Sequence, residues 1–325
     1  MIKKKPFFIA EISANHAGSF NRAKKLILLA KNSGADAVKL QTYTADTMTL
    51  RSKKKYFKIN SGLWKKYKYM WNLYDKAKTP LSWHKKLFTY AKKIGIQIFS
   101  TPFDESAVEF LTKLKCPIFK IASFEMNDIP LIKKVAKTKK PIIISTGMAT
   151  LKEIERAYKT AKKNGAKDIT LLYCVSNYPS ANSDFNLNNI RLLKKKFKCK
   201  IGFSDHSIDN KIAILAVSCG AEVIEKHIAL ENQKKGFDIE FSLKGREIKE
   251  FINDINMAYK LTQGKNFIRA KNEDKSKIHR RSIFTIKDIN KGEKFTKDNI
   301  KVIRPGYGAD PLYFEKLIGK KSPKK

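Results

Sequence analysis

Short apolar segments rich in β-branched residues recur along the chain, and each is followed by an amphipathic stretch with a period near 3.6 residues. Alternation of this kind predicts parallel strands that are covered by helices. Eight such units within residues 1–264 fit a closed (β/α)8 TIM barrel better than an open doubly wound sheet. The expected strands are 7–13, 37–43, 96–102, 118–123, 141–147, 169–176, 201–206 and 223–230.

The pattern changes after Gly264. Residues 265–279 are polar and charged, as is typical of a linker between domains. Residues 280–325 contain short strand-like runs separated by turns. We therefore expect a barrel domain over 1–264, a linker over 265–279 and a small C-terminal domain over 280–325, which has too little core to stand alone and should pack against something.

One connection is much longer than the others. Residues 44–80 separate the second and third expected strands and contain several aromatic residues. A long insertion after a barrel strand lies at the carboxyl face, where active sites form. It is therefore either a loop that covers the substrate, or a structural excursion or oligomer contact.

The composition limits the cellular setting. No segment approaches the roughly 20 apolar residues that span a bilayer, and residues 1–6 lead directly into a strand rather than a signal peptide. We expect a cytoplasmic protein with no membrane partner. The four cysteines are far apart and form no C-x-x-C pair, which favours reduced thiols over a zinc knuckle or redox pair.

The formal net charge of +38 would by itself suggest a nucleic-acid partner. However, the lysines are spread over nearly every expected helix, and no nucleic-acid-binding motif accompanies them. We therefore expect no nucleic-acid partner, although anionic substrates would be attracted. A basic nucleic-acid-binding protein remains an alternative.

Polar side chains at the carboxyl ends of barrel strands are candidate catalytic residues. Any single one can be a satisfied core group, but acids and bases from eight strands that meet at one end are hard to explain by packing. The candidates are Glu11, Asn15, His16, Lys39, Gln41, Ser100, Thr101, Asp104, Lys120, Ser123, Glu125, Ser145, Thr146, Ser176, Tyr178, Asp205, His206, Glu225, Lys226 and His227.

Two of the five histidines, His206 and His227, follow consecutive strands. Side by side, two imidazoles can bind a divalent metal and leave positions open for water and substrate. An isolated histidine is more often structural, but the neighbouring Asp205 and Glu225 can supply the acceptors that orient metal-bound histidines. The spacing does not identify the metal.

Lys39 and Lys120 lie within strands that should be buried, where a lysine is costly unless it is paired with an anion. A permanent partner such as Glu11 or Glu125 would be purely structural. Alternatively, the two lysines bind a phosphate and a carboxylate of a substrate.

The hydroxyls of Ser123 and Ser176 would assist in anion binding. A further alternative is an aldolase in which Lys120 or Lys226 forms a Schiff base with the substrate.

Seven motifs, in order, resemble those of the sialic acid synthase family. They are residues 10–16, 38–43, 99–104, 119–123, 144–148, 202–206 and 224–227. Residues 280–308 resemble the antifreeze-like (SAF) C-terminal domain of the same family. The resemblance covers almost the whole chain and implies a TIM-barrel enzyme followed by a SAF domain.

Within the family, residues 73–85 and 236–243 resemble pseudaminic acid synthases more than N-acetylneuraminic acid synthases. This resemblance implies condensation of phosphoenolpyruvate with an amino-sugar aldehyde, 2,4-diacetamido-2,4,6-trideoxy-L-altrose, to a nine-carbon 2-keto acid with release of phosphate. An N-acetylneuraminate or legionaminate synthase of the same family is the alternative.

The resemblance also implies roles for individual residues. The anionic groups of phosphoenolpyruvate would be held by Lys39, Lys120, Ser123 and Ser176. A divalent metal, Mn²⁺ first with Mg²⁺ or Co²⁺ as alternatives, would bind His206 and His227. Substrate would also be bound by Gln41, Thr101, Tyr178, Ser204 and Asp238, and protons would be moved by Glu11 or Glu125. In a domain-swapped homodimer, Arg304 of one subunit would reach into the active site of the neighbouring subunit.

The chain departs from the family pattern at two places. Lys244 and Gly245 stand where the family usually has Glu-Pro, and the sequence stops at Lys325 where members commonly continue for another strand. The C-terminal domain is therefore expected to be shortened.

Overall fold

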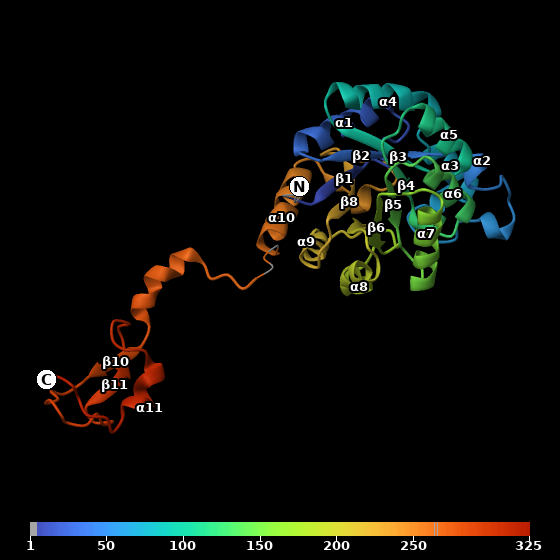
Figure 1. Ribbon diagram of the computed structural model, residues 1–325. Coiled ribbons are helices and arrows are strands. Elements are labelled where there is room, and N and C mark those ends of the chain that lie inside the picture. The colour runs from blue at the N-terminus through green and yellow to red at the C-terminus, as the bar shows by residue number, and fades with distance from the viewer. Residues whose placement is uncertain (1–4, 263, 265) are drawn as a thin grey trace. The chain divides into compact units, whose positions relative to one another are not determined.

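The computed structural model describes residues 5–262, 264 and 266–325 (Figure 1). It contains two compact units, Met1–Gln263 and Gly264–Lys325, and each is described by itself. The finer division into a barrel over 1–264, a linker over 265–279 and a small domain over 280–325 remains a prediction.

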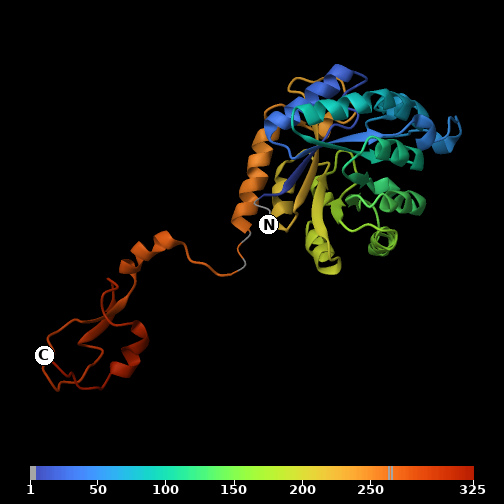
Figure 2. The same ribbon diagram turned by 45° about the horizontal axis from the view of Figure 1, so that its top comes forward.

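The first unit is built around a closed barrel of eight parallel strands (Figures 1 and 2). The strands pair in sequence order, and β1 also pairs with β8, which closes the sheet. They are β1 Phe7–Glu11, β2 Ala37–Thr42, β3 Gln97–Pro102, β4 Phe119–Ile121, β5 Ile142–Ser145, β6 Ile169–Cys174, β7 Lys200–Asp205 and β8 Val223–Ala229. The TIM-barrel prediction is confirmed, and each expected strand agrees with an observed one to within a few residues at its ends.

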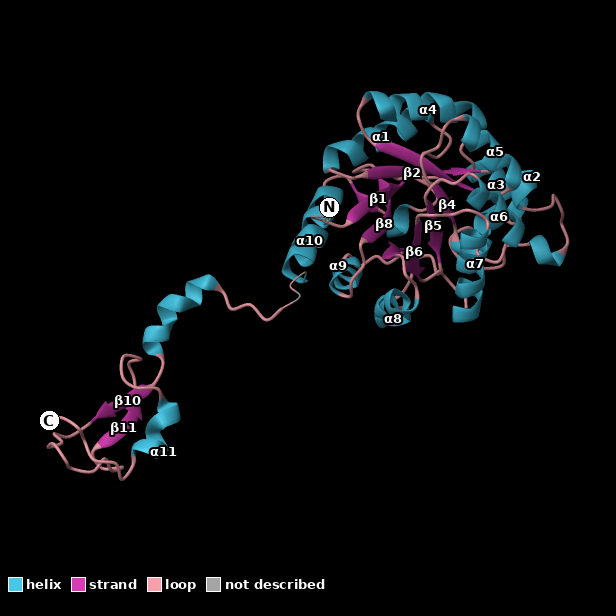
Figure 3. Ribbon diagram, in the orientation of Figure 1, coloured by secondary structure: helices cyan, strands magenta, loops and turns pink. Residues whose placement is uncertain are grey.

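Helices surround the barrel (Figure 3). They are α1 Phe20–Ser33, α4 Leu81–Lys93, α5 Glu105–Lys113, α6 Ile129–Lys137, α7 Leu151–Lys163, α8 Asn188–Lys196, α9 Lys211–Ser218 and α10 Glu247–Thr262. The sequence of α7 shows why these segments are helical: Thr150 and Glu153 form a capping box, and Ile154, Ala157 and Ala161 bury one face. The opposite face of α7 carries its charges.

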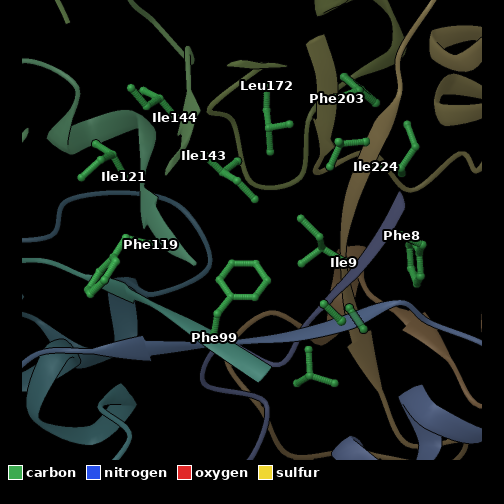
Figure 4. Close-up of a cluster of buried hydrophobic side chains, with 14 of the residues drawn as sticks. Phe8, Ile9, Phe99, Phe119, Ile121, Ile143, Ile144, Leu172, Phe203 and Ile224 are labelled. Atoms are coloured by element: carbon green, nitrogen blue, oxygen red, sulfur yellow. The ribbon is translucent and has the colours of Figure 1, made fainter. Parts of the chain in front are cut away.

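Apolar side chains fill the inside of the barrel. Figure 4 shows Ile9, Phe99, Ile143 and Leu172, from four different strands, converging between the strands. All four are buried. These side chains fill the barrel below the carboxyl ends of its strands. The open space lies at the carboxyl ends themselves.

The insertion after β2 is structured. It contains α2 Ala45–Met48, two short 3-10 turns and α3 Met70–Ala77. Its end is tied to the barrel, because buried His16 Nε2 lies 3.0 Å from Thr79 Oγ1. Burial lowers the pKa of His16 to about 4, so the imidazole is neutral and acts as a hydrogen-bonding anchor.

The departure from the family pattern at Lys244 and Gly245 has a local explanation. Leu243–Lys244 forms β9, which pairs with the end of β8. Gly245 has φ +48°, and a Cβ there would lie 1.5 Å from Glu231 Oε2. That carboxylate accepts from the backbone N of Arg246 at 2.9 Å, so glycine leaves room for an acceptor at the start of α10.

The second unit contains the antiparallel strands β10 Ser282–Thr285 and β11 Ile300–Ile303 and the short helix α11 Phe314–Leu317. Ile283, Ile289 and Ile300 form its small core. A small C-terminal region with two short strands is therefore confirmed. Among all residues that the structure describes, no helix has the length and apolar character needed to cross a bilayer.

Candidate functional site

A cavity of about 530 Å³ opens at the carboxyl ends of the strands. Most of the residues expected at the site line it. They are Glu11, Lys39, Gln41, Lys120, Ser123, Glu125, Ser145, Tyr178, Ser204, His206, Glu225, His227 and Asp238. The strand ends therefore meet where the alternating pattern placed them.

Two further candidates stand behind the lining. Thr101 Oγ1 accepts from Lys39 Nζ at 3.2 Å. A Cβ on Gly147 would lie 2.5 Å from Ser176 Oγ and 2.7 Å from Ser123 Oγ, so the two serines converge over this glycine. Arg304 is exposed in the second unit, and its role stays a prediction.

A buried network of charges occupies the floor of the cavity. Lys39 Nζ lies 2.5 Å from Glu11 Oε2 and 3.3 Å from Glu225 Oε2. Lys120 Nζ lies 3.7 Å from Glu225 Oε1 and donates to Ser145 Oγ at 2.6 Å. Two ammonium groups are thus matched by two carboxylates, which is how a protein keeps such charges out of water.

Glu225 links the two lysines. Burial alone would raise its pKa, but the ammonium groups of Lys120 and Lys39 lower it to about 2, so it stays ionised. The expected structural partner of Lys39 is confirmed as Glu11, whereas Lys120 pairs with Glu225 rather than Glu125. Sequence reasoning assigned Glu225 no substrate role, although its position two residues before His227 places both on one face of β8.

The two histidines lie next to each other. The ring centroids of His206 and His227 are 5.5 Å apart. His206 Nδ1 lies 3.0 Å from the carbonyl oxygen of Val175, which fixes the tautomer and leaves Nε2 free to act as a ligand. Burial holds the pKa of His227 well below its usual value, so this imidazole is neutral, the form that binds metals.

The expected acceptors of the histidines were wrong. Asp205 pairs with Lys226, and Glu225 pairs with the lysines of the floor. The groups beside the rings are the Val175 carbonyl and Asp238, whose Oδ2 lies 3.6 Å from His227 Nδ1. For Asp205 this outcome follows from strand alternation, because it is adjacent in sequence to His206 and points to the opposite face of the sheet.

The residues fit a divalent metal. Among the described residues no cluster of three or more His, Cys, Asp or Glu side chains is placed to hold a metal, and the imidazole donors that line the cavity are His206 and His227. The Nδ1 atom of His227 is buried and has no hydrogen-bond partner. Two imidazoles in an open cavity leave further coordination positions for water or a substrate oxygen.

Lys226 does not reach the cavity. Its ammonium group donates to Asp205 Oδ2 at 2.6 Å and to the Ser207 carbonyl at 2.7 Å. Of the two lysines considered for a Schiff base, Lys120 is therefore the one that lines the cavity. Burial lowers the pKa of Lys120, and Glu225 opposes this shift.

Glu125 has the environment of a proton-transfer group. It lines the cavity, and its buried Oε2 atom has no hydrogen-bond partner. Burial raises its pKa to about 7, with Lys120 acting in the opposite direction. A carboxyl group with this pKa can either give or take a proton near neutral pH.

The walls of the cavity come largely from the insertion, which sequence reasoning left undecided. Met70, Leu73, Tyr74 and Ala77 line it from one face of α3, as their i, i+3, i+4, i+7 spacing allows. The helical period of this apolar stripe was readable in the sequence, but the surface that it would face was not.

A second wall is aromatic and joins two loops. Trp64 Nε1 donates to the Phe237 carbonyl at 3.0 Å, and Tyr67 stacks on Phe237 at 5.3 Å between ring centroids. Trp64 also lies 5.7 Å from the ring of Tyr178, which lies 4.5 Å from the ring of His206. The insertion therefore extends to the histidine side of the cavity.

The sequence profile of the NeuB family matches residues 26–266, and that of the SAF domain matches residues 280–325. The chain belongs to the NeuB family. The expected family is thereby confirmed, and NeuB membership makes the chain a phosphoenolpyruvate-dependent nonulosonic acid synthase, a transferase. The family implies phosphoenolpyruvate and an amino sugar as substrates, and its enzymes are typically metal-dependent.

Individual members of the NeuB family are similar over nearly their full length. The chain is 44% identical to the pseudaminic acid synthase of Campylobacter jejuni serotype O:2, covering 99% of this chain and 93% of that protein. It is 39% identical to the N,N'-diacetyllegionaminic acid synthase of the same strain, covering 98% and 96%. The crystal structure of N-acetylneuraminic acid synthetase from Leptospira borgpetersenii in complex with citrate matches with TM-score 0.75 and 31% identity, covering 84% and 90%.

Proposed function

We propose that this chain is a pseudaminic acid synthase. It would condense phosphoenolpyruvate, 2,4-diacetamido-2,4,6-trideoxy-L-altrose and water to pseudaminic acid and phosphate. The observation that carries the proposal is the 44% identity to a curated pseudaminic acid synthase over 99% of the chain, against 39% to a legionaminic acid synthase. Legionaminate and N-acetylneuraminate synthesis are the alternatives.

Phosphoenolpyruvate binds on the charged floor in this proposal. Lys39 and Lys120 attract its phosphate and carboxylate, and the Ser123 and Ser176 hydroxyls, which converge over Gly147, donate to the anionic oxygens. Because Glu11 and Glu225 hold the lysines in place before the ligand arrives, little reorganisation is needed on binding.

The amino sugar lies between the histidines and the walls. A divalent ion on His206 and His227 would supply Lewis-acid polarisation of the sugar aldehyde. Gln41, Tyr178 and Asp238 line the same space and position the sugar hydroxyls and amides. Ser204 donates to Glu225 at 2.9 Å and so supports the floor rather than the sugar.

The reaction forms one carbon–carbon bond and breaks one carbon–oxygen bond. The C3 carbon of phosphoenolpyruvate attacks the aldehyde carbon, and the aldehyde oxygen takes up a proton to become a hydroxyl. Water adds to the cationic C2 carbon and gives a proton to the Glu125 carboxylate. The tetrahedral intermediate then expels phosphate by cleavage of the bond between C2 and the phosphate ester oxygen. The proton of the C2 hydroxyl leaves with the phosphate, so that the keto group remains.

The remaining parts of the proposal concern the assembly and its setting. Arg304 would complete the cavity of a second copy in a domain-swapped homodimer, as the resemblance implies. The chain would act in the cytoplasm, where both substrates would be available.

A substrate panel tests the proposed function. The purified chain is incubated with Mn²⁺, phosphoenolpyruvate and, in parallel, the altrose-derived sugar, its legionaminate-type isomer or N-acetylmannosamine. We expect phosphate release and a nine-carbon product by mass analysis with the altrose-derived sugar. Release with another sugar alone would reassign the substrate, and removal of metal by a chelator should abolish release until Mn²⁺ is restored.

A substitution on α3 tests the placement of the sugar. Acetamido and deoxy methyl groups suit the apolar stripe, so Met70→Gln should raise the KM for the sugar by roughly 10-fold, because a buried polar group costs 1–3 kcal/mol. Steady-state phosphate release measures this KM. Lys76→Gln on the exposed face of α3 is the matched control, and equal KM values in both variants would show that α3 does not contact the sugar.

A further inference from the structure

A second buried ion pair lies outside the cavity. Lys226 Nζ donates to Asp205 Oδ2 at 2.6 Å. The two residues are 1% and 0% exposed, and neither is among the described residues that line the cavity. They are register partners on β8 and β7. The pair therefore lies on the outer face of the barrel, beneath the helices.

The position of this pair relative to the histidines is unusual. The preceding register pair, Ser204 and Glu225, faces the cavity, where Ser204 Oγ donates to Glu225 Oε1 at 2.9 Å. The residues after the ion pair are His206 and His227, which also face the cavity. Side chains alternate between the two faces of a strand, so the ion pair points outward between two pairs of residues that point into the cavity. The ion pair joins the last register partners of β7 and β8, which directly precede the two histidines.

The same ammonium group holds the chain on both sides of His206. It donates to the carbonyl of Ser207 at 2.7 Å as well as to Asp205. Ser207 in turn donates from its backbone N and its hydroxyl to Asp205 Oδ1, at 2.8 and 2.6 Å. Residues 205 and 207 are thus fixed together, and Lys226 itself directly precedes His227.

Stability alone does not account for such a pair. Desolvation offsets most of the attraction between two fully buried charges, and apolar side chains often stabilise a fold as well or better. What the pair adds is a fixed geometry, since the carboxylate and the ammonium are each held by more than one hydrogen bond.

We propose that the Asp205–Lys226 pair is a positioning device that sets the spacing and orientation of His206 and His227 so that both imidazoles can bind one divalent ion. The inference rests on the two-histidine metal site of the proposed function. It does not depend on which sugar is the acceptor. Neither Asp205 nor Lys226 lines the cavity, so both would act through the backbone of the two strand ends.

The deciding variant is D205N/K226M. It removes both charges together, so neither is left buried without a partner, and the asparagine amide oxygen can still accept from Ser207. The titrant is Mn²⁺ alone, and free Mn²⁺ is measured by electron paramagnetic resonance. We expect a Kd for Mn²⁺ that is about 10–100-fold higher than in the wild type, with an unchanged far-ultraviolet circular dichroism spectrum.

The matched control is D168N/K200M. Asp168 and Lys200 form an exposed ion pair between the starts of β6 and β7, at 3.2 Å and far from the histidines along both strands. Its Kd for Mn²⁺ should equal that of the wild type. A D205N/K226M variant with a lower unfolding midpoint but the wild-type Kd would overturn the proposal and leave the pair a structural element.

A milder variant decides the question if D205N/K226M does not fold. Ser207→Ala removes one donor to Asp205 without changing any charge, and we expect it to raise the Kd for Mn²⁺ by about 3-fold. An unchanged Kd in this variant would overturn the proposal.

Mn²⁺ binding by the wild-type chain separates this inference from the proposed function. If the wild-type chain binds no Mn²⁺, the two-histidine site is wrong and the inference is wrong with it. If the wild-type chain binds Mn²⁺ but shows no turnover, only the proposed substrates are contradicted.

Discussion

Glu125→Gln is expected to lower the kcat of phosphate release by about 10²–10⁴-fold, the usual contribution of a positioned acid–base group. The amide has nearly the shape of the carboxyl group but cannot take up the proton that water releases when it adds to C2. Glu125 is the group whose pKa burial raises to about 7 in the cavity. Stopped assays of phosphate release with both substrates saturating measure the effect.

The role of Glu125 should also be visible in how kcat/KM depends on pH. A carboxyl group that accepts a proton is active when ionised, so the wild-type kcat/KM should fall as pH decreases through about 7. In Glu125→Gln this acidic limb should be lost, leaving a low and flat rate. The exposed Glu109→Gln on α5 is the control and should keep the wild-type profile.

Two outcomes would contradict this role. A rate that falls as pH rises through 7 would make Glu125 an acid that donates its proton rather than a base. A Glu125→Gln variant with the wild-type kcat would remove Glu125 from proton transfer altogether.

Lys39→Met should destabilise the fold strongly. It would leave the carboxylate of Glu11, which lies 2.5 Å from Lys39 Nζ, buried without its partner. Breaking a buried pair in this way costs about 3–5 kcal/mol of unfolding free energy. Urea denaturation followed by circular dichroism measures it, and Lys39→Met/Glu11→Gln should recover most of the loss.

The destabilisation should depend on pH. Burial already raises the pKa of Glu11 in the folded chain, with Lys39 opposing the shift, so loss of Lys39 raises it further. The folded state of Lys39→Met then holds a proton that the unfolded state releases above its ordinary pKa of 4.5. Unfolding free energy therefore falls as pH rises from that value, and the variant should be closest to the wild type in acid.

The exposed Lys200→Met provides the comparison, because loss of a surface ion pair changes the unfolding free energy by no more than about 1 kcal/mol. If Lys39→Met and Lys200→Met lower the unfolding free energy by the same amount, the buried ion pairs on the cavity floor contribute no more stability than a surface ion pair. A double variant as unstable as Lys39→Met would place the loss in packing rather than in the unpaired carboxylate.

The sequence by itself was sufficient for the barrel and for most of the charged and hydrogen-bonding side chains on the floor of the cavity. Strand and helix periods are local, so segments such as Val223–Ala229 and Leu151–Lys163 could be recognised without knowledge of their neighbours. Once a barrel of eight parallel strands was expected, the residues at the carboxyl ends of the strands had to lie at the same end of the barrel. That geometry explains why His206, His227 and Lys120 were found together.

Only the tertiary structure decided which partner each of these groups has. Pairing depends on the register between strands and on barrel closure, which local periodicity does not contain. Lys120 therefore pairs with Glu225, and the acceptor beside His206 is a backbone carbonyl. The insertion was visible as a long aromatic stretch, but its apolar stripe on α3 became a cavity wall only through long-range packing against the strand ends.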